Sequence, residues 1–244
     1  MFFRKSMFII GLIATISASA FAKDVTIPQV NADNPPALAD YRLSYAEMRD
    51  IADAKKLSHR VFYIPSVGPD AAWFDAVKKG NLAEIKKMVA GGQNLEAKDE
   101  AMFGQTALGW AAFIGYQDIV RYLVKQGADL FATDRADVKS AFKSAVLGKN
   151  VEVVKYIYPM VKDKIDVNDQ TLDNEGESLV MIAASNNRID VVKYLISLGA
   201  NLNLVSTELD QSALTYACER GHQDMVKLLI DNGAINHRTK KPSC

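Results

Sequence analysis

The clearest pattern of hydrophobic and polar positions lies between residues 104 and 130, which read GQTALGWAAFIGYQDIVRYLVKQGADL. The second half of this stretch repeats apolar residues at helical spacing and predicts one buried stripe: Ile119, Val120, Leu123 and Val124. Gly127 then provides the left-handed residue that commonly ends a helix. Before the stripe, residues 106–112 predict a shorter helix that Thr106 caps, and Gly115 with Tyr116 forms the turn between the two helices.

The same unit of short helix, turn and longer helix recurs along the chain. A small residue of the short helix keeps its place in each copy, at intervals of 35, 34, 38 and 34 residues: Ala76, Ala111, Ala145, Ala183 and Ala217. Two sets of apolar residues in the longer helix keep those intervals: Met88, Leu123, Ile157, Leu195 and Leu229, and Ile85, Val120, Val154, Val192 and Val226. Such a period indicates helix pairs that are too small to fold alone and that bury a shared apolar layer by stacking.

These units resemble ankyrin repeats, whose short helix opens with T-P-L-H-x-A. The matching stretches are TALGWA at 106–111, SLVMIA at 178–183 and SALTYA at 212–217, none of which keeps the Pro and His. The family's G-A-D-x-N ending is similar to residues 199–203 and 233–236. The resemblance covers residues 68 to 238 and implies an all-α ankyrin-repeat solenoid of about five helix-turn-helix repeats, with an N-terminal capping helix.

The pattern divides the chain into a signal peptide, an N-terminal segment with a capping helix, a repeat domain and a polar tail. These parts are residues 1–22, 23–66, 67–238 and 239–244. The repeats are expected at about 68–100, 101–135, 136–172, 173–206 and 207–238.

The third repeat is the least regular. Val161 stands where the other copies have a terminating glycine, and Pro159 lies within the longer helix, which it should end or kink. Four extra residues then precede the next copy. Two interpretations follow, a tolerated loop insertion or a bend that reshapes the binding face.

The segment before the repeats contains one predicted helix. Ser44 followed by Glu47 resembles a capping box, and a helix from about Tyr45 to Leu57 would place Met48 and Ile51 on one side. We expect this helix to cover the exposed end of the stack, because terminal repeats need a polar outer face. The alternative is a separate functional module.

The first 22 residues have the organisation of a secretory signal peptide. Arg4 and Lys5 precede an apolar run, and Ala20-Phe21-Ala22 fits a cleavage site, so we expect a cut after Ala22 rather than an uncleaved membrane anchor. Removing two of the 29 basic residues and none of the 29 acidic ones leaves a net charge of −2. The expected location is a bacterial periplasm, with full secretion as the alternative.

Charge and motif content argue against several classes of protein. Equal numbers of basic and acidic residues, 29 each, lack the basic excess typical of nucleic-acid binding. The three histidines form no metal or catalytic motif, so we expect no enzyme and no cofactor. The acidic residues between 163 and 176 do not match an EF-hand loop and are also common turn residues, so no metal site is expected.

The two cysteines are Cys218, in the last short helix, and Cys244 in the polar tail. A bridge between them requires the tail to fold back, and a free thiol is equally compatible with the sequence.

The resemblance implies that partners bind the concave surface formed by the turn tips and the outer side of the short helices. The second repeat places an unusual apolar cluster there: Met102, Phe103, Gln105, Phe113, Ile114 and Tyr116. In the first repeat, Lys78 and Lys79 occupy the positions that correspond to Phe113 and Ile114 of the second repeat. Exposed apolar clusters often mark interaction sites, and aromatic residues are enriched in binding hot spots. The alternative is that Phe103 or Phe113 packs against the N-terminal segment or fills a gap left by irregular neighbouring repeats.

The sequence therefore predicts a non-catalytic protein–protein interaction scaffold that binds a protein partner through a concave ankyrin face outside the cytoplasm. The alternative is a secreted effector that binds a host protein. We expect a monomer. We also expect no stable membrane insertion, because no apolar run reaches the length of a spanning helix.

Overall fold

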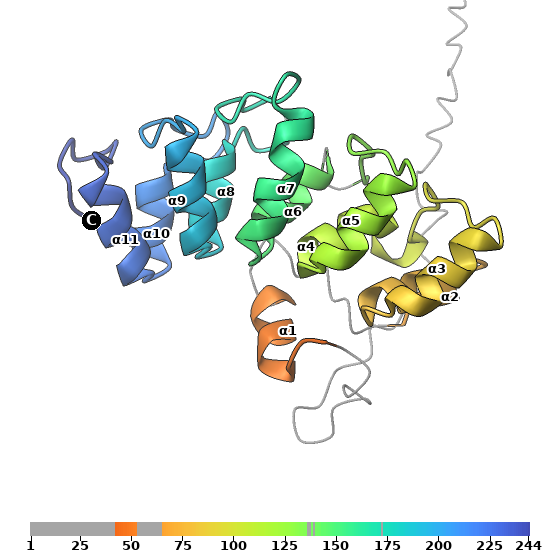
Figure 1. Ribbon diagram of the computed structural model, residues 1–244. Coiled ribbons are helices and arrows are strands. Elements are labelled where there is room, and N and C mark those ends of the chain that lie inside the picture. Colours follow the sequence, from red (N-terminus) through yellow and green to blue (C-terminus); the bar gives the residue numbers. More distant parts are fainter. Residues whose placement is uncertain (1–41, 53–64, 136–137, 139, 172) are drawn as a thin grey trace, which may run out of the picture.

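The computed structural model describes residues 42–52, 65–135, 138, 140–171 and 173–244 (Figure 1). The predicted signal peptide therefore lies outside the described residues. In the described part, one α-helix precedes five pairs of α-helices, and the short 3-10 helix η3 (Glu100–Met102) lies between the first two pairs. The only strand-like pairing there is the isolated bridge between Asp99 and Gln105. The first helix is α1 (Tyr45–Ala52), and the pairs are α2 (Ala71–Lys78) with α3 (Leu82–Ala90), α4 (Ala107–Ile114) with α5 (Gln117–Lys125), α6 (Ala141–Leu147) with α7 (Val151–Val161), α8 (Leu179–Ser185) with α9 (Ile189–Ser197), and α10 (Ala213–Glu219) with α11 (Gln223–Asp231).

The pairs stack side by side along the molecule, which confirms the predicted all-α solenoid (Figure 1). Each short helix packs against its neighbours, α4 against α2 and α6, and α8 against α6 and α10. The long helices form the second layer, with α7 contacting α5 and α9. The repeated alanines of the short helices are all buried, at 7% exposure or less, in keeping with the shared apolar layer that the repeat pattern predicts.

Local sequence signals set the ends of these helices. Gly109 N–H donates to Thr106 Oγ1 at 3.0 Å, so Thr106 caps α4 as predicted. Gly127 follows α5 with a left-handed φ of 93°, a conformation that favours glycine. In the third pair, α7 runs through Pro159 to the buried Val161, so of the two predicted effects, an end or a kink, the proline does not produce the first. Pro159 lies in the last turn, where a missing N–H costs one hydrogen bond and few residues follow.

Hydrogen bonds one repeat apart connect the loops that join successive pairs. Asn168 Oδ1 accepts from Asn201 N–H at 2.7 Å, and Asn203 Oδ1 accepts from Ile235 N–H at 2.9 Å. Each loop therefore orients the next through a side chain that satisfies a backbone donor.

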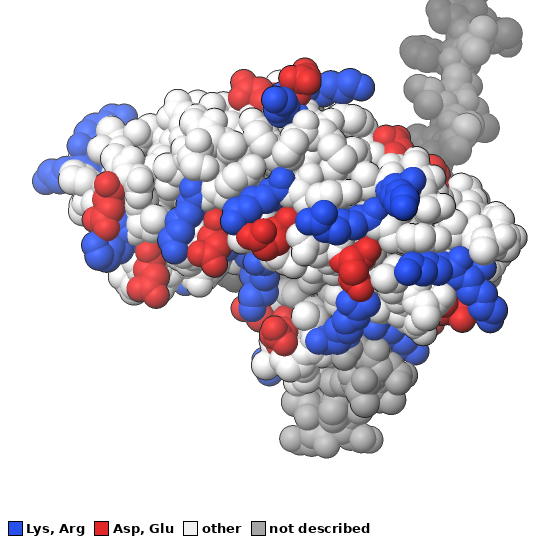
Figure 2. Space-filling view, in the orientation of Figure 1, with Lys and Arg blue, Asp and Glu red and all other residues white. Residues whose placement is uncertain are grey.

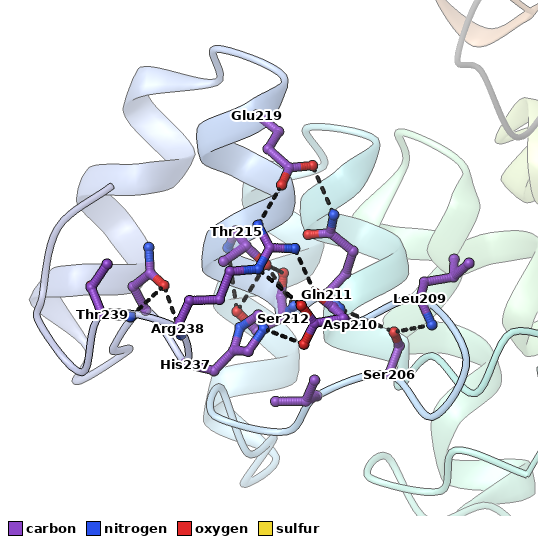
Figure 3. A network of polar contacts seen from close by, with 12 residues as sticks. Ser206, Leu209, Asp210, Gln211, Ser212, Thr215, Glu219, His237, Arg238 and Thr239 are labelled. Atoms are coloured by element: carbon purple, nitrogen blue, oxygen red, sulfur yellow. Dashed lines mark hydrogen bonds and ion pairs between the residues drawn. The ribbon is translucent and has the colours of Figure 1, made fainter.

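The C-terminal tail folds back onto the last pair, where Cys218 of α10 is bonded to Cys244. Arg238 donates to Glu219 Oε1 at 2.9 Å and to Asp210 Oδ2 at 3.1 Å, and so connects the tail, α10 and the preceding loop (Figure 3). The bridge and these ion pairs close the C-terminal end of the stack.

Helix α1 forms as the capping box predicts. Ser44 N–H donates to Glu47 Oε2 at 3.0 Å, and Glu47 N–H donates to Ser44 Oγ at 3.2 Å. The helix extends to Ala52, and the rest of the span predicted up to Leu57 lies outside the described residues.

The expected position of this helix is wrong, because α1 does not cover the first repeat at the end of the stack. It lies along the edge where the short and long helices of each pair are joined (Figure 1). Asp50 is 3.2 Å from Lys149 in the α6–α7 turn and 3.4 Å from Arg188 in the α8–α9 turn. The charges of these turns and a shared core that takes up Met48 and Ile51 hold the helix there. Within the described residues, no helix has the length and apolar character needed to cross a bilayer.

Candidate protein-interaction surface

The six residues predicted to bind a partner differ in exposure. Phe103 is 46% exposed, at the tip of the loop between α3 and α4. The other five are buried, each at most 7% exposed: Met102, Gln105, Phe113, Ile114 and Tyr116. The expectation that these five face solvent is therefore wrong for this conformation, and packing within the chain accounts for them.

Tyr116 shows why. Its hydroxyl donates to the carbonyl of Lys78 at 3.0 Å, and the Arg42 guanidinium lies 4.9 Å from its ring centroid. Loss of water around the phenol raises the pKa of Tyr116 to about 12. The ring thus joins the first two repeats to the segment that precedes α1.

The burial extends over the three central short helices. Every residue of α4, α6 and α8 is buried, including polar ones such as Lys143 and Ser144. In these three helices, the side that the resemblance assigns to partners is therefore not accessible in this conformation. The loop tips remain exposed, and three of them present large apolar side chains: Phe103, Leu209 and Ile235.

Phe103 has a constrained position within its loop. Its φ of 55° lies in the left-handed region, which a bulky side chain rarely adopts. Its carbonyl accepts from Arg135 N–H at 2.7 Å, and Arg135 also pairs with Glu100 at 2.7 Å. The next loop therefore holds Phe103 in place while half of its side chain remains in solvent.

Two lysines form buried ion pairs that the sequence did not reveal. Lys78 Nζ lies 2.8 Å from Asp99 Oδ2 with both side chains fully buried, and Trp110 Nε1–H donates to the same oxygen at 3.0 Å. Burial lowers the pKa of Lys78, and Asp99 partly opposes that shift. In the second buried ion pair, Lys143 Nζ lies 2.6 Å from Asp173 Oδ2. The lysines lie inside the stack with fixed counterions, an arrangement that supports structure rather than catalysis.

One acidic cluster has carboxylate oxygens within 4.8 Å of one another: Asp173, Glu175 and Glu177. Asp173 already binds the Lys143 ammonium, so a cation at this cluster would have to displace a buried partner. Asp173 of this cluster thus serves as the counterion of Lys143.

The charges on the face seen in Figure 2 are mixed in sign, with Lys and Arg interspersed among Asp and Glu. The long helices contain ion pairs between residues three positions apart: Glu84–Lys87 at 3.3 Å, Glu152–Lys155 at 2.7 Å and Asp190–Lys193 at 3.2 Å. Such local neutralisation does not provide the single-sign surface that a polyanion requires.

Comparisons with known proteins agree with the architecture. The family model described as ankyrin repeats in three copies matches residues 73–171 and 144–240. Over 156 residues, 54% of this chain, the chain is 26% identical to the ankyrin repeat and KH domain-containing protein mask-1 of Caenorhabditis elegans. Over 183 residues, 61% of this chain, it is 27% identical to mouse Rabankyrin-5, and over 62 residues, 25% of this chain, 44% identical to human palmitoyltransferase ZDHHC13. It spans 6%, 15% and 10% of these relatives' own lengths, so their whole-protein activities do not transfer.

Proposed function

Because the chain belongs to the ankyrin-repeat family, we propose that it is a non-catalytic scaffold that binds a protein partner outside the cytoplasm, in a bacterial periplasm. The observation that carries the binding role is the repeat architecture itself, which the family match and the stacked helix pairs establish over the same residues. Stacked repeats provide rigid, extended surfaces that suit protein recognition.

Two features support the location. The pattern of residues 1–22 is that of an export signal. A disulfide bond such as that between Cys218 and Cys244 is typical of proteins in oxidising compartments, because cytoplasmic thiols are kept reduced. Fractionation of the native cells tests the location: recovery from the periplasm supports the proposal. Recovery from the culture medium would instead favour the secreted effector that binds a host protein.

The loop-tip part of the concave face is the binding surface that we propose, with Phe103 as its anchor. Phe103 is the member of the predicted set that a partner reaches without rearrangement of the stack. An aromatic side chain held by its neighbours loses little conformational freedom on binding, which is typical of a hot spot.

Co-purification of the tagged chain from the native envelope fraction tests the scaffold role, with mass spectrometry to identify the captured protein. Phe103→Asn removes the ring and keeps the left-handed backbone, which asparagine tolerates. Met160→Gln, at the end of α7 with a similar exposure of 41%, is the matched control. We expect Phe103→Asn to reduce capture and Met160→Gln to leave it unchanged. Equal capture by both variants would exclude Phe103 as the anchor, and specific turnover of a substrate by the purified chain would overturn the non-catalytic assignment.

A further inference from the structure

Helix α1 and the residues before it span the turns of four successive repeats. At one end, the Arg42 guanidinium donates to the carbonyl of Gly80 in the α2–α3 turn and pairs with Asp118, at the start of α5, at 3.0 Å. At the other end, Asp50 reaches Lys149 and Arg188 in the turns of the third and fourth repeats. We call this surface, formed by the turns at Gly80, Tyr116, Lys149 and Arg188, the turn edge.

Few contacts of α1 are buried. Among the side chains of α1 that the structure describes, Met48 and Ile51 are the fully buried ones, at 0% and 1% exposure. The ion pair between Arg42 and Asp118 is open to water, with side chains 41% and 44% exposed, and such pairs contribute little stability. An eight-residue helix is also too short to persist alone in water. The helix is therefore stable only when it is docked. Two buried apolar side chains and the covalent connection to the repeats keep it docked.

The turn edge contains a site that α1 fills incompletely. The Arg188 side chain is 3% exposed, and its Nε–H donates to the Leu147 carbonyl at 2.8 Å. Its Nη1 reaches Asp50 Oδ2 only at 3.4 Å, and its Nη2 is buried without a hydrogen-bond partner among the described residues. A buried guanidinium is best satisfied by a carboxylate that accepts from both Nη atoms. Asp50 is 57% exposed and shared with Lys149, so it does not meet that demand.

We propose that the turn edge is a docking site for an amphipathic helix of a protein partner, and that α1 occupies it reversibly. The partner helix has two apolar residues three positions apart, as Met48 and Ile51 are, and a carboxylate that reaches both Nη atoms of Arg188. Glutamate at the Asp50 position suits this requirement because its side chain is one methylene longer. The inference rests on the proposed role as a protein-binding scaffold and adds a second surface, separate from the Phe103 loop.

Competition between a tethered and a free helix provides the test. The probe is a labelled synthetic peptide of residues 42–52, RLSYAEMRDIA, and the same peptide with Asp50→Glu. The proteins are the chain from residue 23 onward and its variant Met48→Ser with Ile51→Ser, which releases α1. Fluorescence anisotropy measures the dissociation constant of each pair, and circular dichroism confirms that both stacks are folded.

We expect the released variant to bind the peptides at least about tenfold more tightly than the unchanged chain, because a tethered competitor acts at a high effective concentration. We also expect the glutamate peptide to bind more tightly than the aspartate peptide, and a scrambled peptide not to bind. Equal affinity of both chains for the peptide, or no binding by a folded released variant, would overturn the proposal.

A second variant keeps the test decisive if the loss of two apolar anchors unfolds the stack. Arg42→Ala with Asp50→Ala changes only exposed side chains and weakens both ends of the docked segment. It should also bind the peptides more tightly than the unchanged chain. If the peptides fail while Phe103-dependent capture of a partner persists, the turn edge is excluded and the scaffold role stands.

Discussion

Removal of one partner of the buried pair Lys78–Asp99 should destabilise the stack far more than removal of both charges. Asp99→Asn leaves the Lys78 ammonium fully buried without its counterion, which lies 2.8 Å away in the native chain. Ser66 Oγ at 2.7 Å and the Trp110 ring at 4.9 Å remain as weaker partners. Loss of a buried counterion typically costs about 3–5 kcal/mol. For a domain of this size, each kcal/mol lowers the melting temperature by about 2–4 °C, so we expect a decrease of roughly 6–20 °C.

The double variant Lys78→Met with Asp99→Asn isolates the interaction. Methionine has a similar length and carries no charge, so the buried ammonium is absent and the cost of its unpaired state disappears. We expect the double variant to regain at least half of the stability lost by Asp99→Asn, a coupling of about 2 kcal/mol or more. Thermal and urea unfolding followed by circular dichroism for the two single variants and the double variant measures this coupling.

The pH dependence provides an independent check. Burial lowers the pKa of Lys78 in the folded chain below its unfolded value, and loss of Asp99 should lower it further. Between the two pKa values the unfolded chain binds more protons, so the free energy of unfolding rises with pH in that window. The deficit of Asp99→Asn should therefore shrink as the pH increases from 7 towards 10. Additive single-variant effects, within about 0.5 kcal/mol, would refute the reasoning, as would a decrease of less than about 2 °C.

Three further perturbations test the packing of the stack. The bond between Cys218 and Cys244 joins residues 26 positions apart, and its reduction should lower the free energy of unfolding by about 3.5 kcal/mol. The variant Cys218→Ala with Cys244→Ala is the control, and a melting temperature of this variant that still responds to reductant would contradict the prediction. Ala183→Leu should overpack the short helices and cost about 1–3 kcal/mol in urea unfolding, whereas the exposed Ala90→Leu should leave the midpoint unchanged, and equal effects would argue against the close contact. Phe113→Ser, at a fully buried position, should lower the melting temperature by about 6 °C or more, and a smaller change would indicate that the ring is dispensable.

The sequence predicted those parts of the fold that depend on local or periodic signals. The register of Ala111 and Leu123 repeats in every copy, and stacking requires only that each unit resemble its neighbour. The Thr106 cap and the Ser44–Glu47 capping box each involve residues three positions apart, so their geometry follows from short stretches alone.

Burial of the candidate site could not be predicted from such signals. The exposure of Phe113 and Tyr116 was inferred from the resemblance, in which the corresponding surface is open. In this chain, Arg42 reaches Tyr116 from 74 positions away, and no periodic pattern encodes that contact. Lys78 holds the position that corresponds to Phe113, and its burial was likewise not predictable, because its counterion Asp99 belongs to a later loop and only the folded stack brings the two together.

The path of α1 along the turn edge affects the mechanics of the molecule. In a simple repeat array each unit contacts only its immediate neighbours, so the array can bend or extend by small changes at each contact between neighbouring repeats. Here a segment attached at Gly80 and at Arg188 bridges four units on one edge. Flexure that opens this edge has to pull α1 from its contacts, whereas flexure in the opposite direction does not. The compliance of the solenoid should therefore depend on the direction of bending, and release of α1 should make the two directions alike.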